Sequence, residues 1–331
     1  MKGRYTFEEG TSSGLTFVRL FDRGTGSEVT VFPKLGHTIT SFIHNKQELL
    51  YFPFDPKDYS ENKSLAGIPF LYPFANRLNR KGFYFKDQFY EFEGEIFRDQ
   101  FSNPLHGFLL KEKAWDLTSI DESIDGIQLT SRLNFNEQLE CFRNFPFSHS
   151  IEMGIELKNG NLSISLKVTN SGNKDLPLGF GFHPYFKIPF EDRNKTILHL
   201  PSNFEISVDK NLIPDGRLIP ISKNEPIFLK DVSLDTGYTD LERDEYGFAH
   251  FVTIHREFRT EILFGRQYKT AMVYTPLGED YICIEPMLNP TNSWNSPGID
   301  WMSFPILSPG EVFSEVFQIK PKTAVQSLEN R

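Results

Sequence analysis

The sequence predicts an all-β protein: a single large antiparallel β-sandwich with very little helix. Apolar and polar residues alternate with period two along several segments, as they do in strands with one buried and one exposed face. Turn signals separate these segments at the spacing expected of a sandwich or barrel. Long helical periods are missing, and only residues 55–65 suggest a helical turn.

The first strand candidates are short and aromatic. They are residues 28–32, 38–43, 48–52, 83–85 and 89–92. A turn over residues 33–36 separates the first two, and Pro53 ends the third. The polar residues 86–88 form a connection of hairpin size between the last two.

The centre of the chain carries the clearest strand pattern. Residues 127–135, 149–157 and 162–168 alternate strictly, and Lys158-Asn159-Gly160-Asn161 is a good hairpin turn between the last two. Further candidates follow at 196–208, 248–255, 261–264, 271–274, 281–285 and 312–320. Because we find no linker or internal repeat, we expect residues 1–325 to form one domain and 326–331 a frayed tail.

The composition of the chain indicates which kinds of binding partner and which cellular compartment to expect. The 331 residues carry a net charge of −9 without a basic cluster, which argues against nucleic acid and anionic membranes. No apolar run approaches the roughly 18 residues of a membrane span, and the N-terminus lacks a signal-peptide core. Two distant cysteines without a CxxC pattern suit a reducing cytoplasm. Of the 33 phenylalanines, we expect most in the core and a few at a site.

Several familiar chemistries lack their sequence signals. The eight histidines form neither an HxH nor an HExxH pattern, so no metal site is indicated. GxGxxG, the P-loop and the GxSxG nucleophile motif are also missing, which argues against dinucleotides, nucleoside triphosphates and a serine nucleophile.

Two residues are candidates for proton transfer. His183 follows two glycines, has aromatic neighbours and precedes Pro184, and histidine exchanges a proton near neutral pH. A core histidine on a buried turn is the alternative. Glu285 ends an apolar strand, where poor solvation raises a carboxyl pKa and suits a general base. An exposed glutamate at a strand end is the alternative there.

Other polar residues could bind a ligand. Arg77 follows Asn76 in a loop rich in proline and aromatics, and its guanidinium could fork onto hydroxyls or a carboxylate, unless it forms a surface ion pair. His106 is pinned between Pro104 and Gly107, although a plain turn histidine is equally consistent. Asp235 could accept hydrogen bonds from paired hydroxyls, or cap a turn, and Asp240 is close enough in sequence to be confused with it.

Taken together, these segments resemble the aldose 1-epimerase (galactose mutarotase) family. The resemblance rests on Asn76-Arg77, Leu105-His106-Gly107, His183-Pro184-Tyr185-Phe186, Asp235, Glu285-Pro286 and the closing turn Leu307-Ser308-Pro309-Gly310-Glu311, and it spans about residues 29–319.

The resemblance implies a galactose mutarotase-like β-sandwich with a shallow sugar pocket, no metal and no organic cofactor. By similarity, Glu285 is the general base on the C1 hydroxyl of an aldose and His183 the general acid on the ring oxygen. Arg77, His106 and Asp235 would hold the sugar, with Asn76 and Tyr185 beside them.

The chain also departs from the usual family pattern. Lys187 stands where asparagine is common, residues 287–292 lack the usual tryptophan-threonine pair, and the glycine-arginine pair before Asn76 is missing. These changes leave His183 and Glu285 in place and concern the positions that would decide which sugar is bound.

Three hypotheses follow. A mutarotase for free hexoses is favoured, acting as a monomer or homodimer. An enzyme for hexose 6-phosphates would need a cationic clamp, for which Arg77, Arg80 or Lys187 are candidates. A carbohydrate-binding module without turnover would keep the fold alone.

Overall fold

The computed structural model of the protein describes residues 3–188, 190–222, 225–230, 232–255 and 258–323. Its helices are short: α1 (Pro56–Glu61), α2 (Phe190–Arg193) and 3-10 turns at Glu140–Asn144, Ser293–Asn295 and Asp300–Met302. Helix α1 begins where the sequence suggested a helical turn, with the Asp55 side chain accepting from the backbone N of Lys57. No helix in these ranges has the length and apolar character needed to cross a membrane. The expected tail at 326–331 lies outside the described residues.

Three antiparallel sheets contain most of the described strands, which confirms the all-β prediction. The nine-stranded sheet has the order β19 (Ile227–Phe228), β16 (Ile197–His199), β21 (Ala249–His255), β22 (Phe258–Phe264), β26 (Val312–Thr323), β12 (Asn161–Thr169), β11 (His149–Lys158), β10 (Ile127–Phe135), β9 (Asp116–Glu122). The five-stranded sheet is β1 (Tyr5–Ser12), β2 (Leu15–Asp22), β3 (Ser27–Phe32), β4 (Thr38–His44), β5 (Gln47–Glu48).

The third sheet has eight strands. Its order is β18 (Pro214–Pro220), β17 (Ser202–Val208), β20 (Leu234–Leu241), β23 (Thr270–Thr275), β24 (Tyr281–Met287), β14 (Gly181–Phe182), β6 (Phe70–Leu71), with β15 (Tyr185–Lys187) also paired to β24. Two small two-stranded sheets complete the set. They are the hairpin of β7 (Gly82–Phe85) with β8 (Gln88–Glu91) and the long-range pair of β13 (Leu176–Pro177) with β25 (Ile306–Leu307).

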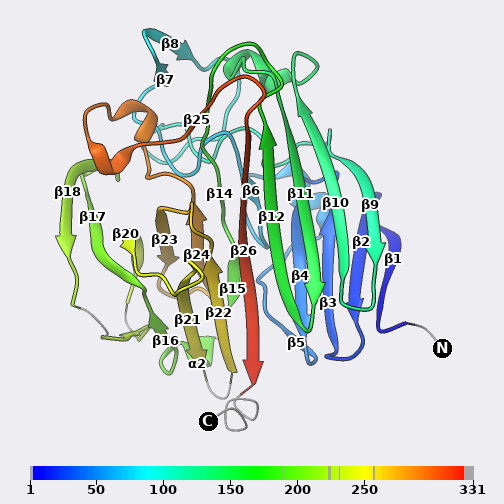
Figure 1. Ribbon diagram of the computed structural model, residues 1–331. Helices are drawn as coiled ribbons and strands as arrows, with labels where there is room; N and C mark the ends of the chain where they lie inside the picture. Colours follow the sequence, from blue (N-terminus) through cyan, green and yellow to red (C-terminus); the bar gives the residue numbers. More distant parts are fainter. Residues whose placement is uncertain (1–2, 189, 223–224, 231, 256–257, 324–331) are drawn as a thin grey trace.

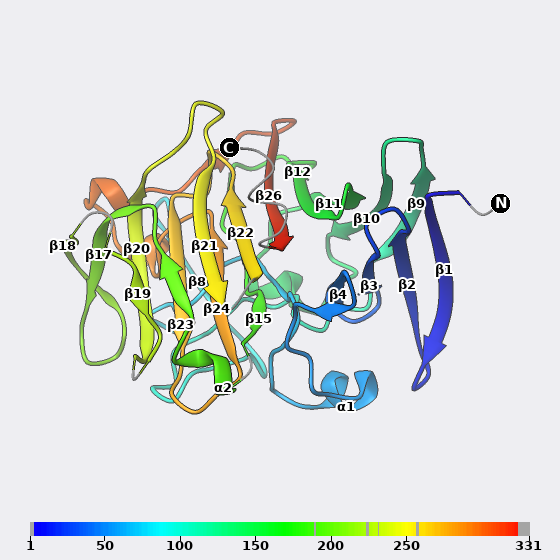
Figure 2. The same cartoon turned by 90° about the horizontal axis from the view of Figure 1, so that it is seen from below.

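The long sheet forms one layer of the sandwich along the molecule. In Figures 1 and 2, the five-stranded sheet faces its β9–β12 half, and the eight-stranded sheet lies against its β21–β22 half. Strand β26, red in Figure 1, joins the halves because it pairs with β12 on one side and β22 on the other. Phe180 and Phe182, which flank Gly181, are 0% and 1% exposed and belong to the core between the layers.

The central hairpins agree closely with the sequence pattern. Strand β10 alternates between buried residues and more exposed ones along its whole length. The turn between β11 and β12 has positive φ at Asn159 (50°) and Gly160 (75°), as a two-residue hairpin requires. Alternation and turn chemistry therefore located these strands correctly.

Elsewhere the strand predictions were wrong or incomplete. The predicted strand 48–52 does not form, because β5 ends at Glu48 and only Leu50 makes an isolated bridge, to Phe186. The predicted strand 196–208 is two strands in different sheets, since Pro201 interrupts the ladder between β16 and β17. Strands β1, β2, β9, β18 and β20 were missed, as were the two- and three-residue strands β6, β13, β14, β15, β19 and β25. β1 and β9 are edge strands with mostly exposed or half-buried side chains, so their alternation is weak.

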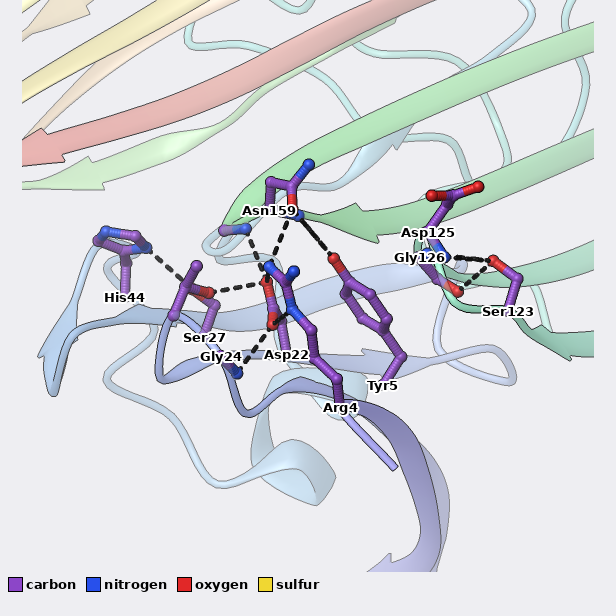
Figure 3. A network of polar contacts seen from close by, with 12 residues as sticks. Arg4, Tyr5, Asp22, Gly24, Ser27, His44, Ser123, Asp125, Gly126 and Asn159 are labelled. Atoms are coloured by element: carbon purple, nitrogen blue, oxygen red, sulfur yellow. Dashed lines mark hydrogen bonds and ion pairs between the residues drawn. The ribbon is translucent and has the colours of Figure 1, made fainter. Parts of the chain in front are cut away.

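A buried polar network fixes the five-stranded sheet to the β11–β12 hairpin (Figure 3). The Asp22 carboxylate is fully buried and accepts from Arg4 Nε at 2.8 Å, Gly24 N at 3.0 Å and, across the interface, Gly160 N at 3.0 Å. Arg4 Nη2 also donates to Asn159 Oδ1 at 2.9 Å. Asp22 and Arg4 thus both connect the N-terminal strands to the long sheet.

Candidate functional site

One face of the eight-stranded sheet carries the carboxylates. Cross-strand partners run from Asp235 on β20 to Tyr274 on β23, Cys283 on β24 and Tyr185 on β15. Glu285 lies two residues beyond Cys283. Because alternate residues of a strand share a face, Asp235, Glu285 and Tyr185 lie on the same side of the sheet.

His183 lies between β14 and β15 and is held by main-chain contacts. Its backbone N donates to Pro69 O at 3.1 Å. A Cβ on Gly181 would come within 2.8 Å of Ala75 Cβ and 2.9 Å of Pro286 O, so only glycine fits where this segment crosses β24. Packing of this kind brings His183 Nε2 to 3.3 Å from Glu285 Oε1. The two predicted proton-transfer residues are therefore in direct contact, with side chains 7% and 3% exposed.

Arg77 connects the loop after β6 to the sheet. Its Nη1 donates to Asn76 Oδ1 at 3.0 Å and its Nη2 to Asp235 Oδ2 at 3.2 Å. Nε donates to Asp99 Oδ2 at 3.0 Å. Arg77 is only 8% exposed, so it is not the surface ion pair considered from the sequence.

His106 is held against Asn76 by two reciprocal hydrogen bonds. The backbone N of His106 donates to Asn76 O at 3.0 Å, and the backbone N of Asn76 donates to His106 Nδ1 at 3.3 Å. Since Nδ1 accepts, a neutral His106 ring carries its proton on Nε2. Both residues have positive φ, 58° for Asn76 and 61° for His106. The His106 ring lies edge-on to His183 with 5.3 Å between centroids.

The structure distinguishes the two candidate aspartates. Asp235 lies within β20 rather than in a capping turn, and it borders a hollow shared with Asn76, Arg77 and Met272. Asp240 is exposed, and its Oδ2 accepts from Asn203 Nδ2 at 3.0 Å. Asp240 also has φ +55°, which interrupts the regular strand conformation there, so of the two aspartates only Asp235 is shown in contact with a residue of the candidate site, Arg77.

Tyrosines form a wall beside His183. Tyr185 stacks on the His183 ring at 4.6 Å with 10° between the planes. The ring centroid of Tyr281 lies 5.0 Å from that of Tyr185, 4.9 Å from that of Tyr51 and 6.3 Å from that of Tyr274. Sequence reasoning found only Tyr185. Alternation in the strand of Glu285 could have indicated Tyr281, whereas Tyr51 and Tyr274 come from separate segments. Phe186, the neighbour of Tyr185, packs into the core instead.

Burial sets the protonation of the pair. Burial lowers the pKa of His183 to about 3. Burial also raises the pKa of Glu285 well above its usual range; the Asp235 charge adds to this and the Arg77 charge opposes it. These directions favour a protonated Glu285 beside a neutral His183, so the pair has one proton that can pass from one residue to the other. Transferring that proton from Glu285 Oε1 to His183 Nε2 gives the carboxylate and imidazolium with the same proton count.

The arrangement supplies a proton donor and acceptor in contact, with hydrogen-bond donors around them. Glu285 Oε2 and His183 Nδ1 are buried without a hydrogen-bond partner among the described residues. Burial is the main cause that keeps the pKa of His106 well below its usual range, and the electrostatic effects of His183 and Arg77 lower it further, so the ring is neutral and its Nε2 proton is free to be donated to a ligand. No cluster of three or more His, Cys, Asp or Glu side chains suited to a metal ion occurs in the described ranges.

The comparisons with known proteins agree with this architecture. A galactose mutarotase-like protein from Clostridium acetobutylicum has a TM-score of 0.87 at 20% identity, over 97% of this chain and 99% of that one. For galactose 1-epimerase from Lactobacillus acidophilus NCFM the TM-score is 0.75 at 15% identity, over 97% and 99%. At these identities both structures establish a shared fold.

Sequence comparison adds two findings. The uncharacterized Escherichia coli K12 protein YphB is 26% identical over 125 residues, which span 37% of this chain and 38% of that protein. The family model for aldose 1-epimerase matches residues 20–320, nearly the whole chain. This protein therefore belongs to the aldose 1-epimerase family.

Proposed function

We propose that this protein interconverts the α and β anomers of a free hexose. The observation that carries the proposal is the buried pair of His183 and Glu285, 3.3 Å apart on a sheet face that also holds Asp235 and Arg77. Anomerisation takes one proton from the C1 hydroxyl and gives one to the ring oxygen. An adjacent base and acid supply both steps.

The reaction starts with the shared proton on His183. The Glu285 carboxylate takes the proton of the C1 hydroxyl while His183 protonates the ring oxygen. The bond between C1 and the ring oxygen breaks, and the open-chain aldehyde forms. After rotation about the C1–C2 bond, both transfers run in reverse and close the ring as the other anomer.

The proton count of the pair stays constant through this cycle. Glu285 is ionised and His183 charged before ring opening; Glu285 is protonated and His183 neutral after it. The second state is the one that burial favours in the pair itself. No proton needs to be exchanged with water between turnovers.

The surrounding groups suit sugar hydroxyls. Neutral His106 presents its Nε2 proton, and Asp235 has an oxygen besides the one that accepts from Arg77. Arg77 would donate toward the sugar from a guanidinium already oriented on three sides. Tyr185 offers an aromatic surface next to the reacting atoms.

Free hexoses are favoured over hexose 6-phosphates by the positions of the basic side chains. Arg77 is engaged by Asp99 and Asp235. Arg80 lies over the Tyr84 ring at 5.6 Å, and Lys187 is exposed on β15. None of these contacts is shared by two of the three side chains, whereas a phosphate clamp needs several cations at one place.

Polarimetry on freshly dissolved α-glucose and α-galactose, corrected for the uncatalysed rate, tests the proposal. Glu285→Gln should lower kcat about 10²–10⁴-fold, because it removes the base while keeping the shape. Glu261→Gln is the matched control: Glu261 is 8% exposed on β22 and pairs with Arg259 and Lys322, away from the site.

Three outcomes would contradict the proposal. Wild-type rates for Glu285→Gln would remove Glu285 from the mechanism. Faster turnover of glucose 6-phosphate than of glucose would favour the phosphorylated substrate. Sugar binding in calorimetry without any rate above background would favour a binding module.

A further inference from the structure

Asp99 is the most deeply buried charged group that touches Arg77. Its side chain is 1% exposed, and its Oδ2 accepts from Arg77 Nε at 3.0 Å. It lies in the loop before His106, at a position that no motif marks. Asp235, the other carboxylate on Arg77, has a side chain that is 32% exposed. The contact with Asp99 is thus the one shielded from solvent.

The loop around Asp99 holds its carboxylate in one orientation. Oδ1 accepts from Phe101 N at 2.9 Å and from Asn103 N at 2.8 Å. The backbone closes the same loop, with Ser102 N donating to Asp99 O and Asp99 N donating to Asn103 O, each at 3.0 Å. With Oδ1 used by the loop, Oδ2 is left to face Arg77.

The same loop continues into the segment that carries His106. Asn103 Nδ2 also donates to Asp99 Oδ2, at 3.2 Å. Leu105 N donates to Phe97 O at 2.9 Å, and Leu105 forms an antiparallel bridge with Arg77. Asp99 therefore contacts two parts of the candidate binding site: the Arg77 guanidinium and the chain segment that leads to His106.

We propose that Asp99 is a positioning residue, which fixes the Arg77 guanidinium between itself and Asp235 and so aims Arg77 at the sugar. Its importance for catalysis rests on the proposed function, and its effect on Arg77 does not. Without the bond at Nε, the guanidinium is held only through Nη1 by Asn76 and through Nη2 by Asp235, so it can shift from its position. An error of about 1 Å in a positioning group costs up to about 100-fold in rate.

Asp99→Asn removes the oxygen that accepts from Arg77 Nε and from Asn103 Nδ2. The asparagine oxygen can still accept from the loop N–H groups, while its NH₂ would face the Nε–H of Arg77, donor against donor. We expect kcat/KM to fall about 10–100-fold with folding retained. Asp244→Asn is the matched control. Asp244 Oδ1 accepts from Tyr246 N and Phe248 N in the same loop pattern, and Oδ2 contacts His250 rather than a site residue.

A double-mutant cycle with Arg77→Met separates positioning from loss of structure. Methionine has neither a charge nor an N–H to meet Asp99, so adding Asp99→Asn to Arg77→Met should change kcat/KM by less than about 2-fold. If the two effects multiply, Asp99 acts by another route and the inference is wrong.

An NMR readout tests Asp99 independently of turnover. The Nε–H resonance of Arg77, identified by its loss in Arg77→Lys, should be protected from exchange in the wild type and lose that protection in Asp99→Asn. An unchanged resonance would overturn the inference even if the enzyme is active. If the wild type shows no mutarotation but the resonance responds as expected, the proposed function fails and the positioning of Arg77 stands.

Discussion

Gly107 offers a sharp test of how the site is held. Its φ is +71°, and a Cβ placed on it would overlap the carbonyl of Tyr72 and lie 2.9 Å from Pro73 N. Gly107→Ala should therefore push the 106–108 segment away by on the order of 1 Å before carbon and oxygen reach an ordinary contact of about 3.3 Å. His106, the preceding residue, moves with it and loses alignment with Asn76 N.

The expected effects can be worked out separately for stability and rate. The left-handed conformation costs alanine about 1–2 kcal/mol. Losing the hydrogen bond from Phe108 N to Tyr72 O, 2.6 Å long, adds about 1 kcal/mol. The variant should unfold with a free energy lower by about 2–3 kcal/mol, measured in urea. A displacement of this size should also lower kcat/KM up to about 100-fold.

Gly14→Ala is the matched control for backbone strain alone. Gly14 has φ +82° in the β1–β2 turn, and a Cβ added there would meet no atom within 4 Å. It should lose about 1–2 kcal/mol of stability and keep full activity. If Gly107→Ala also keeps full activity, the close approach of Gly107 to Tyr72 does not position His106.

Two further predictions concern His183 and Asp22. His183→Asn should bind sugar in calorimetry as the wild type does, while kcat in polarimetry falls about 10²–10⁴-fold, because asparagine cannot protonate the ring oxygen; full turnover would remove His183 from the mechanism. Asp22→Ala should lower the free energy of unfolding by about 1–3 kcal/mol at pH 7, since the buried N–H of Gly160 loses its acceptor. Burial alone would raise the pKa of Asp22, but bonds from Arg4, Thr25 and Gly24 and the Arg4 charge lower it overall. Because the pKa of Asp22 is lower in the folded protein, the ionised carboxylate stabilises the fold above the unfolded pKa near 4, and this stabilisation is lost as pH falls through the folded pKa. The difference in unfolding free energy between wild type and Asp22→Ala should therefore shrink below about pH 4. A difference that grows in acid would contradict this account.

Local patterns were enough where structure depends on near neighbours. The β10, β11 and β12 hairpins follow from alternation and from the Asn159-Gly160 turn. Strand β1 escaped detection because it is a sheet edge with little burial, which leaves no clear alternation to read. Pro201 could have warned that residues 196–208 are two strands.

The site divides in the same way. His183 and Glu285 stand in distinctive local contexts, so the sequence indicated both. Their contact at 3.3 Å could not be predicted, because it depends on the register of the sheet. Asp99 has no such context. It becomes visible only through its bond to Arg77, 22 residues away, in a loop that looks ordinary. The position of Asp235 within β20 was also obscured, because its neighbours resemble a turn.

The place of β26 has a consequence for the order of assembly. This strand follows every other described strand in the sequence, yet it lies in the middle of the longest sheet, between β12 and β22. During synthesis, β12 and β22 each keep an unpaired edge until residues 312–323 have emerged, and unpaired edges favour association with other chains. The halves become one continuous sheet only in a late, long-range step, which is slow because distant segments must meet. An emerging chain of this protein is thus most prone to associate with other chains just before β26 is available, when the residues of the site have already been synthesised.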